Sequence, residues 1–282
     1  PRILQAFNKP VRDWLEFFCF TTFTDRDGKY QLAALAESGF DPLARTTRFM
    51  LTEEAHHLAV GGNGIGRVVQ RTAELMRDGV DPRTVGAIPL EVLQRYVNDW
   101  ASSSHDLFGG EDSTNAADAF SWGLKGRYRE GHDTGDPSAL GQSYAAAVER
   151  DGRLGGIEIP MRRAMNALLC DAYHADCLQV AERWNRTLAR AGLEARISIP
   201  SPRFNRQIGI HAGKTYDPAG NPIAREEFDA RLPGWLPSDE DRAHVASCML
   251  GVRERGRFAN WIAPPASGVD GKPVDFEYVR IH

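Results

Sequence analysis

The sequence has no long hydrophobic run. None of its apolar stretches reaches the roughly 20 residues that a helix needs to cross a bilayer. The sequence also has no excess of positive charge. Its 34 lysines and arginines are outnumbered by 38 aspartates and glutamates, which gives a net charge of -4. We therefore expect no membrane-spanning segment, and neither nucleic acid nor an anionic membrane as the main partner.

Cysteine is rare as well, with four residues in all: Cys19, Cys170, Cys177 and Cys248. Cys170 and Cys177 are expected on one helix, where their spacing corresponds to about 10 Å, too far for a disulfide. The opening sequence PRILQAFNKP shows no signal-peptide pattern. We therefore expect reduced thiols and a cytoplasmic protein. The sequence begins without methionine, so we also expect further residues upstream.

What the sequence does contain is helical periodicity. Apolar residues recur at helical spacing over Val11–Ser38, and the pattern resumes over Pro42–Met76. Between these segments, Gly39 suits a C-terminal cap, Asp41 an N-cap and Pro42 the first helical turn. The two segments are therefore expected to form an antiparallel helical hairpin.

Other elements are expected along the rest of the chain. Further helices are predicted over Leu90–Asp106, Asn115–Glu130, Met161–Ala191, Arg225–Leu232 and Ser238–Val252. Short strands are predicted at Ile157–Ile159 and Ile197–Ile199, with a turn at Tyr216–Pro222. The expected fold class is mainly α. Residues 1–191 should form a helical bundle, and residues 192–282 a C-terminal extension of short strands and irregular segments packed on it.

Candidate metal ligands stand in the second helix. Its sequence FMLTEEAHHLAVGG contains two overlapping Glu-x-x-His pairs, Glu53 with His56 and Glu54 with His57. Residues three apart share a helix face, so either pair can offer a carboxylate and an imidazole to one metal ion. Helical bundles with two-iron centres use this arrangement on two of their four helices.

Asp25 is the expected partner carboxylate. It lies about as far before the turn between the two helices as Glu54 lies after it, so an antiparallel hairpin places both at one level. Asp25 also lies on the apolar stripe of its helix, where an unpaired carboxylate is unfavourable. This register favours Glu54 and His57 over Glu53 and His56. The alternative interpretation is a solvated helix face without a metal.

The run FTDRDGKYQLAALAESGFDPLARTTRFMLTEEAHH closely resembles the benzoyl-coenzyme A epoxidase family, ferritin-like two-iron oxygenases of aerobic benzoate breakdown. Similar stretches, DLFGGEDSTNAADAF, GLKGRY, RWN, WLPSDEDRAHVAS, FANWIAPP and VDFEYVR, extend the resemblance over nearly the whole chain. It implies a ferritin-like bundle that holds two iron ions. It also implies a monooxygenase that forms the 2,3-epoxide of the benzoyl-CoA ring from O2, with electrons passed from NADPH by a separate flavin and iron–sulfur reductase.

By this resemblance Asp25, Glu54 and His57 are one half of the iron ligands, and no catalytic residue is expected beyond the ligands. Family members carry the other half, a Glu and a first Glu-x-x-His, in a longer N-terminal part. We therefore expect this sequence to be either a fragment or a shortened relative. An in-chain alternative is Asp106 with Asp171 and His174, because Asp171-x-x-His174 has the same spacing. Polar positions on ordinary helices are the other interpretation of these three residues.

Two further sets of residues are candidates for function. Lys125 and Arg127 belong to the nearest basic cluster and could bind the acyl-CoA phosphates, although a solvated helix end explains them equally well. Glu53 and Asp27 could orient metal-bound groups. Two other functions stay open at this stage: a metal-free helical scaffold without catalytic activity, and a bundle that handles iron.

Overall fold

The first helical segment runs through three consecutive elements. In the computed structural model, which describes residues 7–111, 113, 115–125, 142–161 and 163–279, α1 covers Trp14–Cys19, the π-helical turn η2 covers Phe20–Thr24, and α2 covers Asp25–Leu35. Most of the predicted segment is therefore helical. The π turn was not predicted. It ends immediately before Asp25, which is the first residue of α2. Such widened turns interrupt α-helices frequently at functional sites.

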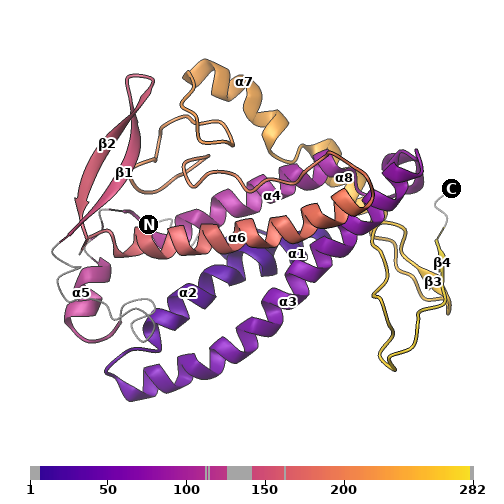
Figure 1. Ribbon diagram of the computed structural model, residues 1–282, viewed down its shortest axis with the longest axis horizontal. Coiled ribbons are helices and arrows are strands. Elements are labelled where there is room, and N and C mark those ends of the chain that lie inside the picture. The colour runs from indigo at the N-terminus through magenta and orange to yellow at the C-terminus, as the bar shows by residue number, and fades with distance from the viewer. Residues whose placement is uncertain (1–6, 112, 114, 126–141, 162, 280–282) are drawn as a thin grey trace.

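The second predicted helix is α3, which covers Asp41–Arg77 and runs antiparallel to α2 (Figure 1). Pro42 stands in its first turn, as predicted, but the N-cap is Phe40 and not Asp41. The predicted cap at Gly39 is also wrong, because the C-cap of α2 is Ala36.

The glycines of α3 permit close packing. A Cβ atom at Gly61 would lie 2.6 Å from the backbone nitrogen of Thr22, and one at Gly64 would enter the ring of Phe18. Only glycine at these two positions lets α3 approach α1 and η2 this closely.

Two further helices complete the bundle around one apolar core. These are α4 (Leu90–His105), followed by the 3-10 turn η4 (Asp106–Phe108), and α6 (Met165–Arg190), with a second 3-10 turn η3 (Pro82–Val85) before α4. Figure 1 shows α6 lying along the α2–α3 hairpin. The core includes Phe23, Ile65, Trp100, Tyr173 and Trp184, all buried. The mainly α fold class is confirmed, and no helix in the described part of the chain is apolar enough over sufficient length to cross a membrane.

The fourth predicted helix is shorter than expected. α5 covers Asn115–Ser121, whereas the prediction extended to Glu130. Gly123 adopts a φ of +69°, and the backbone N–H of Leu124 returns to the carbonyl of Ala119, which ends the helix. The part of the prediction beyond residue 125 lies outside the described residues, up to residue 141.

A β-hairpin precedes α6 where only one short strand was predicted. Strand β1 (Ser143–Arg150) pairs antiparallel with β2 (Arg153–Pro160). The sequence analysis missed β1 because alanine is a weak strand former. The signal that could have revealed it is Asp151-Gly152, where both residues have positive φ, 52° and 77°. This pair is typical of a two-residue hairpin turn.

The predicted strand at Ile197–Ile199 is wrong. Its backbone groups are satisfied by side chains, so no neighbouring strand is required. The Asn185 amide both donates to the carbonyl and accepts from the N–H of Ile197, at 2.9 and 2.8 Å. Gln94 accepts from the N–H of Ser198 at 2.8 Å. The alternating apolar residues Ile197 and Ile199 therefore belong to an irregular segment, which side chains of α4 and α6 hold by hydrogen bonds.

The C-terminal region lies against the bundle. It contains α7 (Arg225–Trp235), α8 (Asp239–Cys248), and strand β3 (Arg257–Phe258) paired parallel with β4 (Glu277–Tyr278). The predicted turn over Tyr216–Pro222 is confirmed by a bridge between its end residues. α8 ends earlier than the predicted Val252. The last segment is held on α3, because Arg71 donates to the Asn260 carbonyl at 3.0 Å and stacks over the ring of Tyr278.

All four cysteines are free and buried. The prediction of unbridged thiols is therefore confirmed. Cys19, Cys170 and Cys177 lie within the bundle core and Cys248 where α8 packs on it. Burial raises the pKa of the Cys177 thiol to about 12. These residues act as small apolar packing groups.

Candidate metal and substrate site

Asp25, Glu54 and His57 converge between α2 and α3. His57 Nδ1 lies 3.6 Å from Glu54 Oε2 and 3.9 Å from Asp25 Oδ2. Asp25 reaches this position as the first residue after the π turn, and Glu54 and His57 share one face of α3. The predicted proximity of the three side chains is confirmed. Their function as metal ligands stays a prediction.

Burial makes both carboxylates unfavourable as isolated anions. Burial, with a smaller contribution from neighbouring Asp25, raises the pKa of Glu54 to about 7, while His57 opposes the shift. Burial also raises the pKa of Asp25. Glu54 Oε1 is buried without a hydrogen-bond partner among the described residues. A cation beside these groups would stabilise their ionised forms.

The donor set suits a metal ion. Two carboxylates and an imidazole are ligands that iron, zinc and manganese accept. Glu54 Oε1 has no hydrogen-bond partner among the described residues, so this oxygen is not committed to another group. Within the described ranges, however, no three or more His, Cys, Asp or Glu side chains are already arranged as a group that could hold a metal. The three residues therefore fit part of a metal site and leave it incomplete.

The absence of a side chain at Gly28 lets the Glu54 carboxylate pack closely against α2. It follows Asp25 by three residues on the same helix face. A Cβ atom at Gly28 would lie 3.1 Å from Glu54 Oε1, closer than an ordinary van der Waals contact. Sequence reasoning missed this residue. A glycine inside a helical segment, one turn from a candidate ligand, is the signal that could have identified it.

The alternative pair on α3 is placed differently. Glu53 and His56 are both exposed. The ion-pair contacts of Asp25 and Glu54 in the described structure come from His57, whose side chain is 51% exposed. The arrangement therefore favours Glu54 and His57 over Glu53 and His56. An orienting function for Glu53 finds no support in these contacts.

A cavity of about 590 Å³ opens beside the carboxylates. Asp25 and Glu54 line it together with Asp27, Gly28 and Gln31 of α2. Its apolar lining comes from Phe7, Leu32, Met50, Leu107, Phe108 and Ala119. Mostly apolar cavities of this size with a few polar groups are typical of small-molecule sites. The cavity can hold an apolar group directly against the candidate metal ligands.

Lys125 enters the same cavity after α5. Its Nζ donates to Gln31 Oε1 at 2.9 Å, and Gln31 Nε2 donates to Asp27 Oδ1 at 3.3 Å. Asp27 is 5% exposed, and burial raises its pKa to about 7 against the opposing effects of Gln31 and Lys125. Lys125 therefore lies close to the candidate metal site. Arg127, its predicted partner in binding phosphate, lies outside the described residues.

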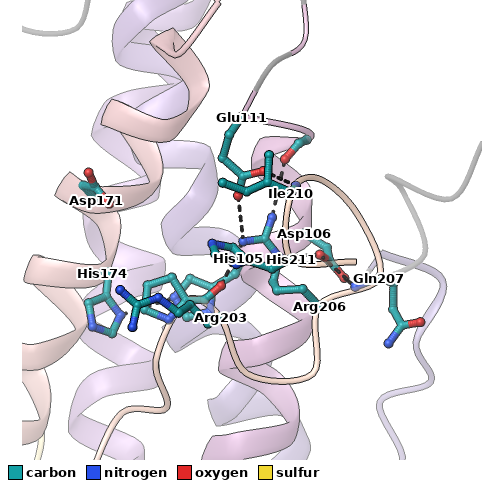
Figure 2. A network of polar contacts seen from close by, with 12 residues as sticks. His105, Asp106, Glu111, Asp171, His174, Arg203, Arg206, Gln207, Ile210 and His211 are labelled. Atoms are coloured by element: carbon teal, nitrogen blue, oxygen red, sulfur yellow. Dashed lines mark hydrogen bonds and ion pairs between the residues drawn. The ribbon is translucent and has the colours of Figure 1, made fainter. Parts of the chain in front are cut away.

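The in-chain alternative for a second half-site has other partners, which Figure 2 shows. Asp106 accepts a hydrogen bond from Arg206 Nε at 2.6 Å, and Glu111 lies 3.3 Å from Nη1 of the same guanidinium. Gln207 donates its backbone N–H to Asp106 as well. Arg206 is 3% exposed, so its positive charge already stands where a metal ion would be required. Sequence reasoning missed this buried ion-pair network.

Asp171 and His174 are also engaged elsewhere. Asp171 accepts from the Tyr144 hydroxyl at 3.0 Å, and His174 Nδ1 lies 3.3 Å from His105 Nε2. Burial lowers the pKa of His174 to about 4. These contacts are those of a polar network joining α4, α6 and β1, and they give no support to metal binding by Asp106, Asp171 and His174.

Comparison with known proteins identifies relatives by sequence. The chain matches no protein-family model. It is 46% identical to "Benzoyl-CoA oxygenase component B" of Aromatoleum evansii over 288 aligned positions, which cover the whole of this chain and 61% of that protein. The chain therefore spans less than two thirds of the length of this relative. Since the identity extends from one end of the chain to the other, the whole of the chain is similar to part of benzoyl-CoA oxygenase component B.

Proposed function

We propose that this chain is part of a monooxygenase that uses two iron ions and O2 to epoxidise the ring of benzoyl-CoA. The observation that carries the proposal is the convergence of Asp25, His57 and the unpartnered Glu54 carboxylate at one wall of a mostly apolar cavity. The name of the relative supports the substrate and the oxygenase class. The ferritin-like arrangement of the bundle is what the resemblance to the epoxidase family implies.

In this proposal Asp25, Glu54 and His57 hold iron, which supplies the oxidising chemistry with O2 when bound. The resemblance assigns the remaining ligands to a longer N-terminal part found in family members. The chain's own residues position the substrate. Met50, Leu107 and other apolar side chains of the cavity exclude water and hold the ring beside the ligands.

Electrons require a partner. The designation "component B" in the relative's name indicates an enzyme of several components. We propose a separate flavin and iron–sulfur reductase that draws on NADPH and delivers electrons to this chain. A cytoplasmic location belongs to the same proposal and is supported by four unpaired, buried cysteines.

Oxygen transfer tests the proposal directly. The full-length protein, supplied with a suitable reductase, NADPH and isotopically labelled O2, should convert benzoyl-CoA to a product one oxygen atom heavier. Mass spectrometry should find the label from O2 in the ring. Free benzoate should remain largely unchanged, because it lacks the CoA group through which the substrate binds. Entry of oxygen from water, or equal reaction of benzoate, would reject the epoxidase assignment.

Metal analysis tests the site. The full-length protein should contain about two iron ions per chain in the family arrangement. Glu54→Ala and His57→Ala should remove most of the iron, whereas the neighbouring controls Glu53→Ala and His56→Ala should retain it. Asp171→Ala should also leave iron content unchanged. Normal iron without oxygen transfer would favour an iron-handling bundle, and a stable protein that binds no iron would favour a metal-free scaffold.

A further inference from the structure

Lys125 is the one cation among the described residues that line the 590 Å³ cavity. Burial lowers the pKa of its ammonium, and Asp27 opposes this shift. Its hydrogen bond within the described structure goes to the neutral side chain of Gln31. An ammonium has three N–H donors, so Lys125 can donate to a ligand without losing this contact. A partly buried cation whose hydrogen bond among the described residues goes to a neutral acceptor is stabilised by a further acceptor that a ligand brings.

Gln31 holds this ammonium in place. An ammonium only donates hydrogen bonds and a carboxylate only accepts them. The amide oxygen of Gln31 therefore faces Lys125, at 2.9 Å, and its amide nitrogen faces Asp27, at 3.3 Å. Because Gln31 lies between Lys125 and Asp27, only one orientation of its amide group satisfies both neighbours. The hydrogen bond to Gln31 of α2 thereby holds the Lys125 ammonium at the cavity.

The position of Gln31 along α2 indicates which part of an acyl-CoA lies near Lys125. Gln31 is six positions after Asp25 in the sequence, which corresponds to about 9 Å along the helix. A ring held beside Asp25 and Glu54, with its substituent directed along the cavity toward Lys125, brings the attached group into this zone. The attached group is the thioester. The CoA phosphates stand at the far end of the long pantetheine arm and lie well beyond it.

We propose that Lys125 binds the carbonyl oxygen of the substrate thioester, with Gln31 and Asp27 as positioning residues. This assignment rests on the proposed function and replaces the phosphate contact inferred from the sequence. A hydrogen bond from the ammonium to the carbonyl holds the ring at a defined distance from Asp25 and Glu54. Lys125 is then a specificity-determining residue that distinguishes a thioester from a ligand without the carbonyl.

The test compares two ligands that differ only in the carbonyl group. Calorimetric titration of the full-length protein, without reductase so that no turnover occurs, uses benzoyl-CoA and S-benzyl-CoA, in which a methylene replaces the carbonyl. The wild-type protein should bind benzoyl-CoA about tenfold or more tightly than S-benzyl-CoA. Lys125→Met should weaken benzoyl-CoA binding by the same factor and leave S-benzyl-CoA binding unchanged. Lys125→Arg should retain most of the difference.

Other outcomes overturn the assignment. If Lys125→Met weakens both ligands and free CoA equally, Lys125 contacts the phosphates. If the variant still discriminates between the ligands, the carbonyl is bound elsewhere. If Lys125→Met does not fold, Gln31→Glu is the second variant. Its carboxylate would pair with Lys125 and should reduce the difference in affinity between the two ligands. An unchanged difference refutes the assignment. Failure of the wild-type protein to bind either CoA ligand would instead reject the proposed function.

Discussion

At the scale of single residues, Gly28 controls the space available to the Glu54 carboxylate. In Gly28→Ala, the added methyl group would lie 3.1 Å from Glu54 Oε1 and would push the carboxylate away from Asp25. Alanine also favours a helix over glycine by about 1 kcal/mol. We therefore expect the iron content of the full-length variant to fall while its melting temperature stays the same or rises. Metal analysis and thermal unfolding measure the two effects separately.

Gly62→Ala is the matched control for this substitution. It also places alanine within a helix, but its Cβ atom would lie 3.8 Å from Val180 Cγ1, an ordinary contact. This variant should gain helix stability and keep its iron. Wild-type iron content in Gly28→Ala would show that the Glu54 carboxylate does not depend on the space beside α2.

The raised pKa of Glu54 predicts a specific pH dependence of stability. The ordinary value is 4.5 and the folded value about 7, so between these values the folded state retains a proton that the unfolded state has released. The free energy of unfolding therefore decreases as pH rises through this range, and the loss is complete above about pH 7. Glu54→Gln cannot ionise. It should make the chelator-treated protein about 1–3 kcal/mol more stable than wild type at pH 8.

Urea unfolding at pH 5 and pH 8 measures this difference. Little of the advantage of Glu54→Gln should remain at pH 5, where folded Glu54 is already protonated. The exposed neighbour provides the control, because Glu53→Gln should show no such dependence. An advantage of the same size at both pH values would mean that ionisation of Glu54 is not its cause.

At the scale of elements, the approach of α3 to the π turn depends on glycine. A Cβ atom at Gly61 would lie 2.6 Å from the backbone nitrogen of Thr22, which cannot rotate away as a side chain can. Gly61→Ala should therefore lower the free energy of unfolding by about 1–3 kcal/mol through overpacking. Gly62→Ala, the next position on α3, should raise it by up to about 1 kcal/mol. Chemical denaturation of both variants gives the comparison.

The opposite signs expected for adjacent glycines make this a test of the packing itself. Both substitutions improve helix propensity equally, so any difference between them reports the contact with η2. Equal stabilities would show that η2 yields easily. In that case the π turn could not hold Asp25 rigidly opposite α3.

At the scale of the whole molecule, the C-terminal extension shares the core of the bundle. Ile197, Val245, Trp261 and Ile262 are buried in the same apolar cluster as Trp100 of α4. Removing residues 193–282 would expose that surface to water, at about 25 cal/mol for each Å² of apolar area. We therefore expect that a chain ending at Gly192 does not fold cooperatively. The chain of 282 residues should unfold in one transition.

Calorimetry and circular dichroism check this expectation. A truncated chain with the helical spectrum of the bundle and a sharp melting transition would contradict it. That result would instead establish the division between residues 1–191 and 192–282 as a boundary between independent domains.

The sequence by itself determined the helical hairpin and the residues that meet within it. Helical periodicity, the position of Pro42 and equal spacing from the turn are local properties, and they were enough to bring Asp25 level with Glu54 and His57. The failures have one local and one long-range cause. Alanines concealed β1, and side chains on α4 and α6 replaced the strand predicted at Ile197–Ile199.

Only the tertiary structure decided what surrounds those residues. The cavity, the contact of Lys125 with Gln31, and the ion pairs of Arg206 with Asp106 and Glu111 join segments far apart in the chain. No periodicity encodes such contacts, because they depend on how close α3 packs on η2 and on where α5 ends. Burial, which follows from that packing, leaves the Glu54 Oε1 atom without a hydrogen-bond partner among the described residues, which is unfavourable for an ionised carboxylate.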